Sequence, residues 1–103
     1  MKNLLAAFIA LLLPFMASAQ FAISGRVTGP GGAPLPGATV TIDGTTIKIA
    51  TDTGGRYRLD GVKGGNYVLK VTYIGYYAAS KNILLNADLT ENFLLENSEM
   101  LTE

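Results

Sequence analysis

The candidate nucleophiles of this 103-residue chain are Ser24, Ser80, Ser98 and several threonines. A serine needs a neighbouring base to take its proton, and histidine, the usual base, does not occur in the sequence. Lys81 follows Ser80, but neighbours on a strand point to opposite faces, so these two side chains cannot meet directly. Every common arrangement for nucleophilic catalysis therefore lacks a member, and we expect no enzyme activity.

Two carboxylates, Asp52 and Asp60, are the candidates for acid–base chemistry or metal binding. Both lie in turn sequences, where an aspartate side chain bonds its own backbone and a glycine supplies the unusual backbone angle. Calcium needs six or more oxygens, so Asp43 or Asp60 would have to approach Asp52 in space. The chain also has no cysteine, which removes thiolate nucleophiles and sulfur-rich zinc sites. We predict no catalytic, cofactor or metal site.

The glycine-rich stretch Gly29-Pro30-Gly31-Gly32 is a third candidate, as a phosphate cradle. Such a cradle requires a strand before it and a helix after it, with a lysine in place. Here a strand pattern follows and no lysine is suitably placed, so the stretch is interpreted as an inter-strand loop. We expect Leu35, which lies between two prolines, to turn inward and pin this loop.

The first nineteen residues have the layout of a secretory signal peptide. Lys2 precedes an apolar run over residues 4–13, and Ala17-Ser18-Ala19 offers small residues to a signal peptidase. The alternative is a membrane anchor, but the run is shorter than the roughly 20 residues needed to span a bilayer. We therefore predict a helical leader over residues 1–19 and export of the remaining chain. No cysteine follows the run to carry a lipid.

The charge of the predicted mature part is close to balanced. Removal of Lys2 leaves seven basic and eight acidic side chains. A nucleic-acid partner would demand a basic face, so this balance argues against one. Without disulfides, the exported domain must depend on its core for stability.

Short alternating segments, separated by turn residues, predict an all-β domain over residues 20–96. The pattern is typical of a seven-stranded antiparallel β-sandwich, transthyretin-like or immunoglobulin-like. Asp43-Gly44 and Asp60-Gly61 are interpreted as turns. The predicted strands cover residues 21–28, 38–42, 46–51, 56–59, 67–74, 76–83 and 90–95. The predicted core comprises Phe21, Ile23, Val27, Val40, Ile42, Tyr57, Leu59, Tyr67, Leu69, Val71, Phe93 and Leu95.

The aromatic segment Tyr73-Ile74-Gly75-Tyr76-Tyr77 is the best candidate for a binding surface. Exposed tyrosines stack on sugars or seat a partner protein. A strand buries one face by default, so we expect Tyr73 and Tyr77 to pack on the core. Ile74 and Tyr76 then form the predicted partner-contact patch, and Gly75 marks a bend or bulge.

The ordered phrases of this sequence resemble the carboxypeptidase regulatory-like domain family. They are Gly25-Arg26-Val27, Pro34-Leu35-Pro36-Gly37-Ala38-Thr39-Val40, Thr51-Asp52 with Gly55-Arg56-Tyr57, Gly65-Asn66-Tyr67 and Tyr73-Ile74-Gly75-Tyr76. The resemblance implies a seven-stranded sandwich without catalytic residues or cofactors of its own.

The leader, the Ile74-Gly75-Tyr76 phrase and the polar tail over residues 97–103 look most like the version at the N-terminus of TonB-dependent, SusC-like outer-membrane receptors. In such receptors the domain lies in the periplasm, ahead of the plug, and the tail leads toward a TonB-box region. The implied function is a non-catalytic accessory domain in nutrient uptake, present here as a fragment without plug and barrel. Its partners would be the plug and barrel or a periplasmic protein, and it would touch the outer membrane only through the receptor.

Two alternatives remain open on the sequence. One is a free-standing exported module that binds a glycan or a protein. The other is a transthyretin-like hydrolase, whose relatives use histidine for chemistry that this chain cannot supply.

Overall fold

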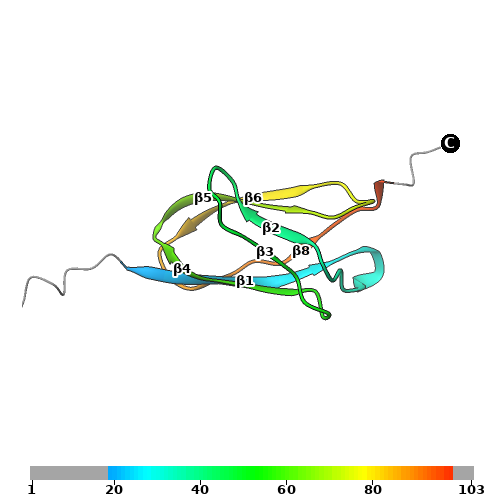
Figure 1. Ribbon diagram of the computed structural model, residues 1–103, viewed down its shortest axis with the longest axis horizontal. Coiled ribbons are helices and arrows are strands. Elements are labelled where there is room, and N and C mark those ends of the chain that lie inside the picture. Colours follow the sequence, from blue (N-terminus) through cyan, green and yellow to red (C-terminus); the bar gives the residue numbers. More distant parts are fainter. Residues whose placement is uncertain (1–18, 99–103) are drawn as a thin grey trace, which may run out of the picture.

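A computed structural model describes residues 19–98, which form two β-sheets packed face to face (Figure 1). One sheet has the order β4-β1-β7, with β8 also paired to β1, and the other has the order β3-β2-β5-β6. The strands are β1 (Gln20–Thr28), β2 (Thr39–Ile42), β3 (Lys48–Ala50), β4 (Arg56–Lys63), β5 (Gly65–Thr72), β6 (Ala79–Leu85), β7 (Leu89–Thr90) and β8 (Phe93–Leu94). The predicted all-β sandwich is confirmed. The predicted leader and tail lie almost wholly outside the described residues.

The core lies between the sheets and follows the alternation of the strands. All predicted core residues are buried except Phe21 and Tyr67, which are partly buried and pack against the core. Leu35 is also buried, as expected for the residue that pins the proline-rich loop. Further buried residues are Ala38, Val62, Ile83 and Leu85.

The C-terminal strand differs from the prediction in two ways. It is broken into β7 and β8 at Glu91 and Asn92, and both pieces pair parallel to β1, so the sandwich is not wholly antiparallel. Side chains complete the pairing where the backbone cannot, because Asp88 and Asn92 accept hydrogen bonds from the N–H groups of Ala22 and Arg26. Taken as one interrupted strand, β7 and β8 restore the predicted seven.

Asp60-Gly61 does not end a strand, contrary to the turn interpretation. β4 runs through it to Lys63, and the register with β1 shifts between Phe21 and Ile23. Gly61 has a φ of 69°, which suits the extra residue of a β-bulge. The bulge keeps Val62 facing the core, where it is 2% exposed.

A buried hydroxyl adds to the backbone hydrogen bonds that hold the proline-rich loop, in which the N–H groups of Leu35 and Gly37 donate to Val27 and Thr51. Thr51 Oγ1 donates to the carbonyl of Leu35 at 2.6 Å and accepts from the N–H of Ala38 at 2.9 Å. Pro30–Gly32 forms a short 3-10 turn, labelled η2, at the tip of the loop. The stretch at 29–32 therefore belongs to a loop between strands, as predicted.

Candidate functional site

The segment 73–77 forms a tight turn at one end of the sandwich. The N–H of Tyr76 donates to the carbonyl of Tyr73 at 3.1 Å, and Gly75 has a φ of 88°. Glycine with positive φ at the third position is the mark of a type II turn. The rings of Tyr73 and Tyr76 lie 5.5 Å apart and pack against the core, which fixes the shape of the turn.

This turn changes which side chains face solvent. Ile74 sits at its tip and is 95% exposed, as expected. Tyr76 is only partly exposed, whereas Tyr77 is 45% exposed, so our assignment of Tyr76 outward and Tyr77 inward is wrong. The alternation of a strand does not continue through a turn, and the next strand, β6, begins only at Ala79.

The turn also holds the outgoing chain. The N–H of Tyr77 donates to the carbonyl of Glu96, and the N–H of Ser98 donates to that of Gly75, each at 2.9 Å. Asn97 forms an isolated β-bridge with Tyr76. Asn97 and Ser98, the first two residues of the predicted polar tail, are therefore fastened to this turn. The last described segment, red in Figure 1, therefore lies beside this turn, at the opposite end of the sandwich from the start of β1.

Apolar side chains and two hollows surround this point. One hollow, of about 370 Å³, is lined by Gly37, Thr39, Thr72, Tyr73 and Ile74. The other, of about 300 Å³, lies between the start of β6 and the end of β8 and includes Tyr77 and Leu94. Leu94 is 63% exposed. We refer to Ile74, Tyr77 and Leu94 as the exit surface.

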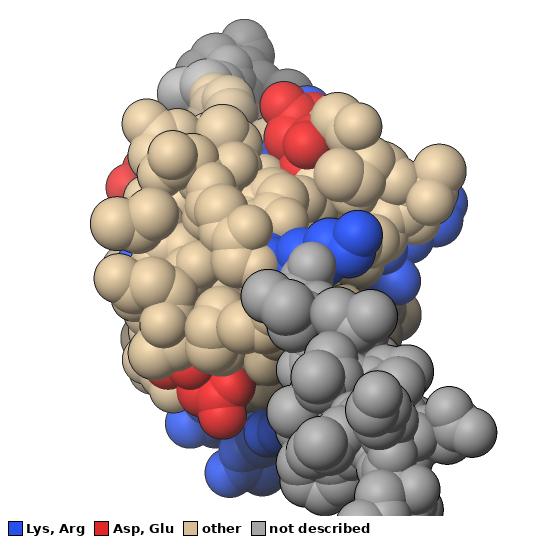
Figure 2. Space-filling model, turned by 90° about the vertical axis from the view of Figure 1, so that its left-hand side faces the viewer, with Lys and Arg blue, Asp and Glu red and all other residues tan. Residues whose placement is uncertain are grey.

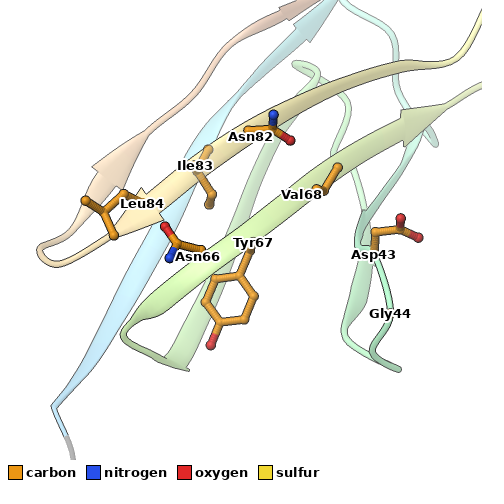
Figure 3. Close-up of a pocket in the computed structure, with 8 residues that line it drawn as sticks. All are labelled: Asp43, Gly44, Asn66, Tyr67, Val68, Asn82, Ile83 and Leu84. Atoms are coloured by element: carbon orange, nitrogen blue, oxygen red, sulfur yellow. The ribbon is translucent and has the colours of Figure 1, made fainter.

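A larger hollow, of about 570 Å³, lies on β5 and β6 beside the β2–β3 turn (Figure 3). Val68 and Asn82 are direct cross-strand partners here and project to the same side of the sheet, while the ring of Tyr67 lies on the other side. The side-chain amides of Asn66 and Asn82 make no hydrogen bond with any residue of 19–98. Figure 2, which looks onto the end where β1 starts, shows uncharged residues over most of the visible surface. This hollow offers the amides of Asn66 and Asn82 and the carboxylate of Asp43 beside apolar side chains.

The remaining candidate residues have structural roles. Asp52 Oδ1 accepts from the N–H groups of Gly54 and Arg56, both at 2.9 Å, which confirms its role in the turn. Lys81 Nζ donates to the carbonyl of Asn92 at 2.6 Å, while Ser80 pairs with Lys70 on the outer face. Ser80 and Lys81 thus point to opposite faces, as predicted. Within residues 19–98, no three acidic side chains gather into a possible metal site.

Sequence reasoning placed Tyr57 in the core but missed its polar contact. Its hydroxyl donates to the carbonyl of Glu91 at 2.6 Å, at the break between β7 and β8. Burial, with a smaller contribution from the Glu91 carboxylate, raises the pKa of Tyr57 far above its ordinary value. The phenol is therefore held in its neutral form.

We expect this tyrosine to make the domain sensitive to alkali. The unfolded chain loses the phenolic proton at about pH 10, and the folded chain loses it at a higher pH. The contribution of this tyrosine to the free energy of unfolding is therefore fully present below about pH 10 and is lost as the pH rises above that value. The slope should approach about 1.4 kcal/mol per pH unit. Urea unfolding of Tyr57→Phe between about pH 9 and 11 should show a shallower loss than wild type. Tyr77→Phe, at an exposed ring, should retain the wild-type slope; equal slopes in all three proteins would contradict the assignment.

Comparison with known proteins identifies related sequences and folds. The sequence profile of the carboxypeptidase regulatory-like domain matches residues 22–96. The TonB-dependent receptor P39 of Formosa agariphila is 41% identical over 59 residues, which span 57% of this chain and 6% of the receptor.

Solved structures show the same sandwich. A chain of a type II cohesin–X-dockerin complex from Acetivibrio cellulolyticus has a TM-score of 0.68 at 24% identity, over 75% of this chain and 58% of that one. A Bacteroides fragilis protein described as membrane-associated has a TM-score of 0.59 at 25% identity, and the match covers 81% of this chain and 30% of that one. The 3-chlorocatechol 1,2-dioxygenase of Rhodococcus opacus has a TM-score of 0.62 at 12% identity, over 79% of this chain and 61% of that one. At this identity the likeness shows the fold alone. Between residues 19 and 98 we find no helix suited to crossing a membrane.

Proposed function

This chain belongs to the carboxypeptidase regulatory-like domain family, and we propose that it is a non-catalytic, periplasmic accessory domain of a TonB-dependent outer-membrane receptor. The receptor of Formosa agariphila supports this proposal, since it contains a related segment. The leader pattern over residues 1–19 supports export. In this proposal the plug and barrel of the receptor take up nutrients, and this domain contacts them.

The observation that carries the proposal is the anchored exit of the chain. Hydrogen bonds from Tyr77 and Ser98 fix the 96–98 segment to the turn that presents Ile74. Whatever follows residue 98 therefore begins beside the exit surface. A segment tethered at this point has a high effective concentration for it.

The exit surface suits a protein contact. An almost fully exposed isoleucine on a turn that is fixed by two neighbouring, tilted tyrosine rings loses little freedom when a partner covers it. Its burial would contribute roughly 1.5–3 kcal/mol. Our predicted patch of Ile74 and Tyr76 is thereby revised: Tyr76 supports the turn from beneath, and Tyr77 and Leu94 extend the surface. The partner in this proposal is the receptor plug or barrel, or a periplasmic protein.

Photo-crosslinking in cells tests this proposal. With benzoyl-phenylalanine in place of Ile74, we expect adducts with peptides of a TonB-dependent receptor or of a periplasmic partner, recovered with the cell envelope. The same group in place of Leu84, which is 61% exposed on a different surface, serves as the matched control. Equal adducts from both positions, or recovery of the protein with the cytoplasm, would count against the proposal.

A second candidate function, carbohydrate binding, is favoured by the hollow on β5 and β6. Unpartnered amides of Asn66 and Asn82 beside Val68 and Leu84 suit the hydroxyl groups and apolar faces of a neutral sugar. Titration of the labelled protein with neutral oligosaccharides should shift the amide signals of β5 and β6. Asn82→Ala should abolish the shifts while Ser80→Ala retains them; no shift in the wild-type protein would exclude this candidate.

A further inference from the structure

All three arginines of this chain lie on the sheet that contains β1 and β4, whereas the basic residues of the other sheet are lysines. Arg26 on β1 and Arg56 and Arg58 on β4 are all exposed, while their strand neighbours Val27 and Tyr57 are buried. Because alternate residues face opposite sides of a sheet, the three arginines share the outer face of β4 and β1. Lys63 lies farther along the same strand, beyond the bulge, and is also exposed. We call Arg26, Arg56 and Arg58 the arginine face.

The arrangement is unfavourable for the isolated domain. Arg26 and Arg56 are direct cross-strand partners, and like charges placed opposite one another destabilise a sheet. Arg58 pairs with Asp60 at 2.7 Å, and Arg26 Nε donates to the carbonyl of Gly54 at 3.2 Å. The Arg56 guanidinium has no hydrogen bond or ion pair with any residue of 19–98. Arg26 and Arg58 are thus partly compensated inside the domain, and the unpaired Arg56 guanidinium opposite Arg26 marks a surface suited to a partner.

We propose that the arginine face docks an acidic, carboxylate-bearing segment of a protein partner. Guanidinium groups form bidentate hydrogen bonds with carboxylates. An extended segment that lies across β4 and β1 would bring its acidic side chains to successive arginines. Ser24 is the cross-strand partner of Arg58 and of Thr90, so hydroxyl groups flank the charges on the outer face. This inference stands independently of the receptor assignment, because it rests on a different surface.

The chemistry of the face argues against other anionic partners. A bilayer would take several apolar side chains as well as charges, but within residues 19–98 this sheet exposes one large apolar residue, Leu94, which pairs with Thr28 two positions beyond Arg26. A single-stranded nucleic acid would need aromatic rings for stacking, and the ring of Tyr57 faces inward. A carboxylate segment needs only the charges and hydrogen bonds that are present.

Binding of a fluorescein-labelled hexaglutamate peptide, followed by anisotropy at low salt, tests this inference. Arg56→Gln/Arg58→Gln should weaken binding about tenfold, the effect of losing two exposed charge contacts. The matched control is Lys48→Gln/Lys70→Gln, which removes the same charge from the outer face of the other sheet, where both lysines flank Thr41. The control should leave the affinity within about twofold.

A second measurement separates docking from a structural role. Arg56→Gln relieves repulsion from Arg26, so its unfolding midpoint in urea should equal or exceed that of the wild type while binding weakens. Equal losses of affinity in the two double variants would show a response to net charge alone and overturn the proposal. Absence of peptide binding, or tighter binding to phosphatidylglycerol vesicles than to the peptide, would overturn it as well.

Discussion

Gly25→Ala is expected to remove about 4 kcal/mol from the free energy of unfolding, a large part of the stability of a small domain. A methyl group at this position would lie 1.7 Å from the carbonyl oxygen of Glu91 and 2.6 Å from its carbon. The neighbouring atoms cannot yield easily. The N–H of Glu91 donates to the carbonyl of Ser24 at 2.8 Å, and the Glu91 carbonyl accepts from the hydroxyl of Tyr57, which would itself lie 2.9 Å from the added methyl group. Urea denaturation measures the loss.

Gly54→Ala is the matched control for this substitution. Neither glycine has a positive φ, so an added side chain is not strained by the backbone angle in either case. At Gly54 the nearest atom is the end of the Arg56 side chain at 3.2 Å, which can move aside. The cost should stay below about 1 kcal/mol. A Gly25→Ala protein as stable as this control would mean that the C-terminal strand does not approach β1 as described.

The close approach at Gly25 shows where sequence reasoning stops. Alternation placed Gly25 on the same face as Ile23 and Val27, which is correct. It carried no information about Glu91, which lies 66 positions later in the chain and reaches β1 only because the last strand pairs parallel to it. Alternation specifies the face of a strand, whereas topology specifies its neighbour. The break at Glu91 and Asn92 was missed for the same reason.

The candidate contact surface was predictable in place but not in detail. The segment 73–77 was identified as the best binding candidate, and Ile74 is exposed as expected. The error at Tyr76 and Tyr77 came from treating aromatic and β-branched residues as a continuing strand. A glycine at the third position of a four-residue phrase, as in Tyr73-Ile74-Gly75-Tyr76, is a signal for a type II turn. More weight on this signal would have ended the strand predicted over residues 67–74 before the turn. The fastening of residues 96–98 to this turn carries no local sequence signal at all.

Thr51→Val should cost about 2–3 kcal/mol, although it changes the shape of the side chain little. The hydroxyl of Thr51 joins the carbonyl of Leu35 to the N–H of Ala38, and both are buried positions. Valine would leave this donor and this acceptor without partners where water cannot easily replace them. The N–H of Ala38 would lose its acceptor, so its hydrogen exchange should quicken along with the fall in the urea midpoint.

Two further variants isolate the hydroxyl as the cause. Thr41→Val, at a partly exposed position on the outer face of β2, should change stability by less than about 0.5 kcal/mol. Thr51→Ser keeps the hydroxyl and should restore most of the loss, apart from about 1 kcal/mol for the missing methyl group. If Thr51→Val were as stable as Thr41→Val, the packing of Leu35 and the backbone hydrogen bonds of Leu35 and Gly37 would be enough to hold the proline-rich loop. The ordered phrase from Pro34 to Val40 would then owe its position to these contacts, and the hydrogen bonds of the Thr51 hydroxyl would be incidental.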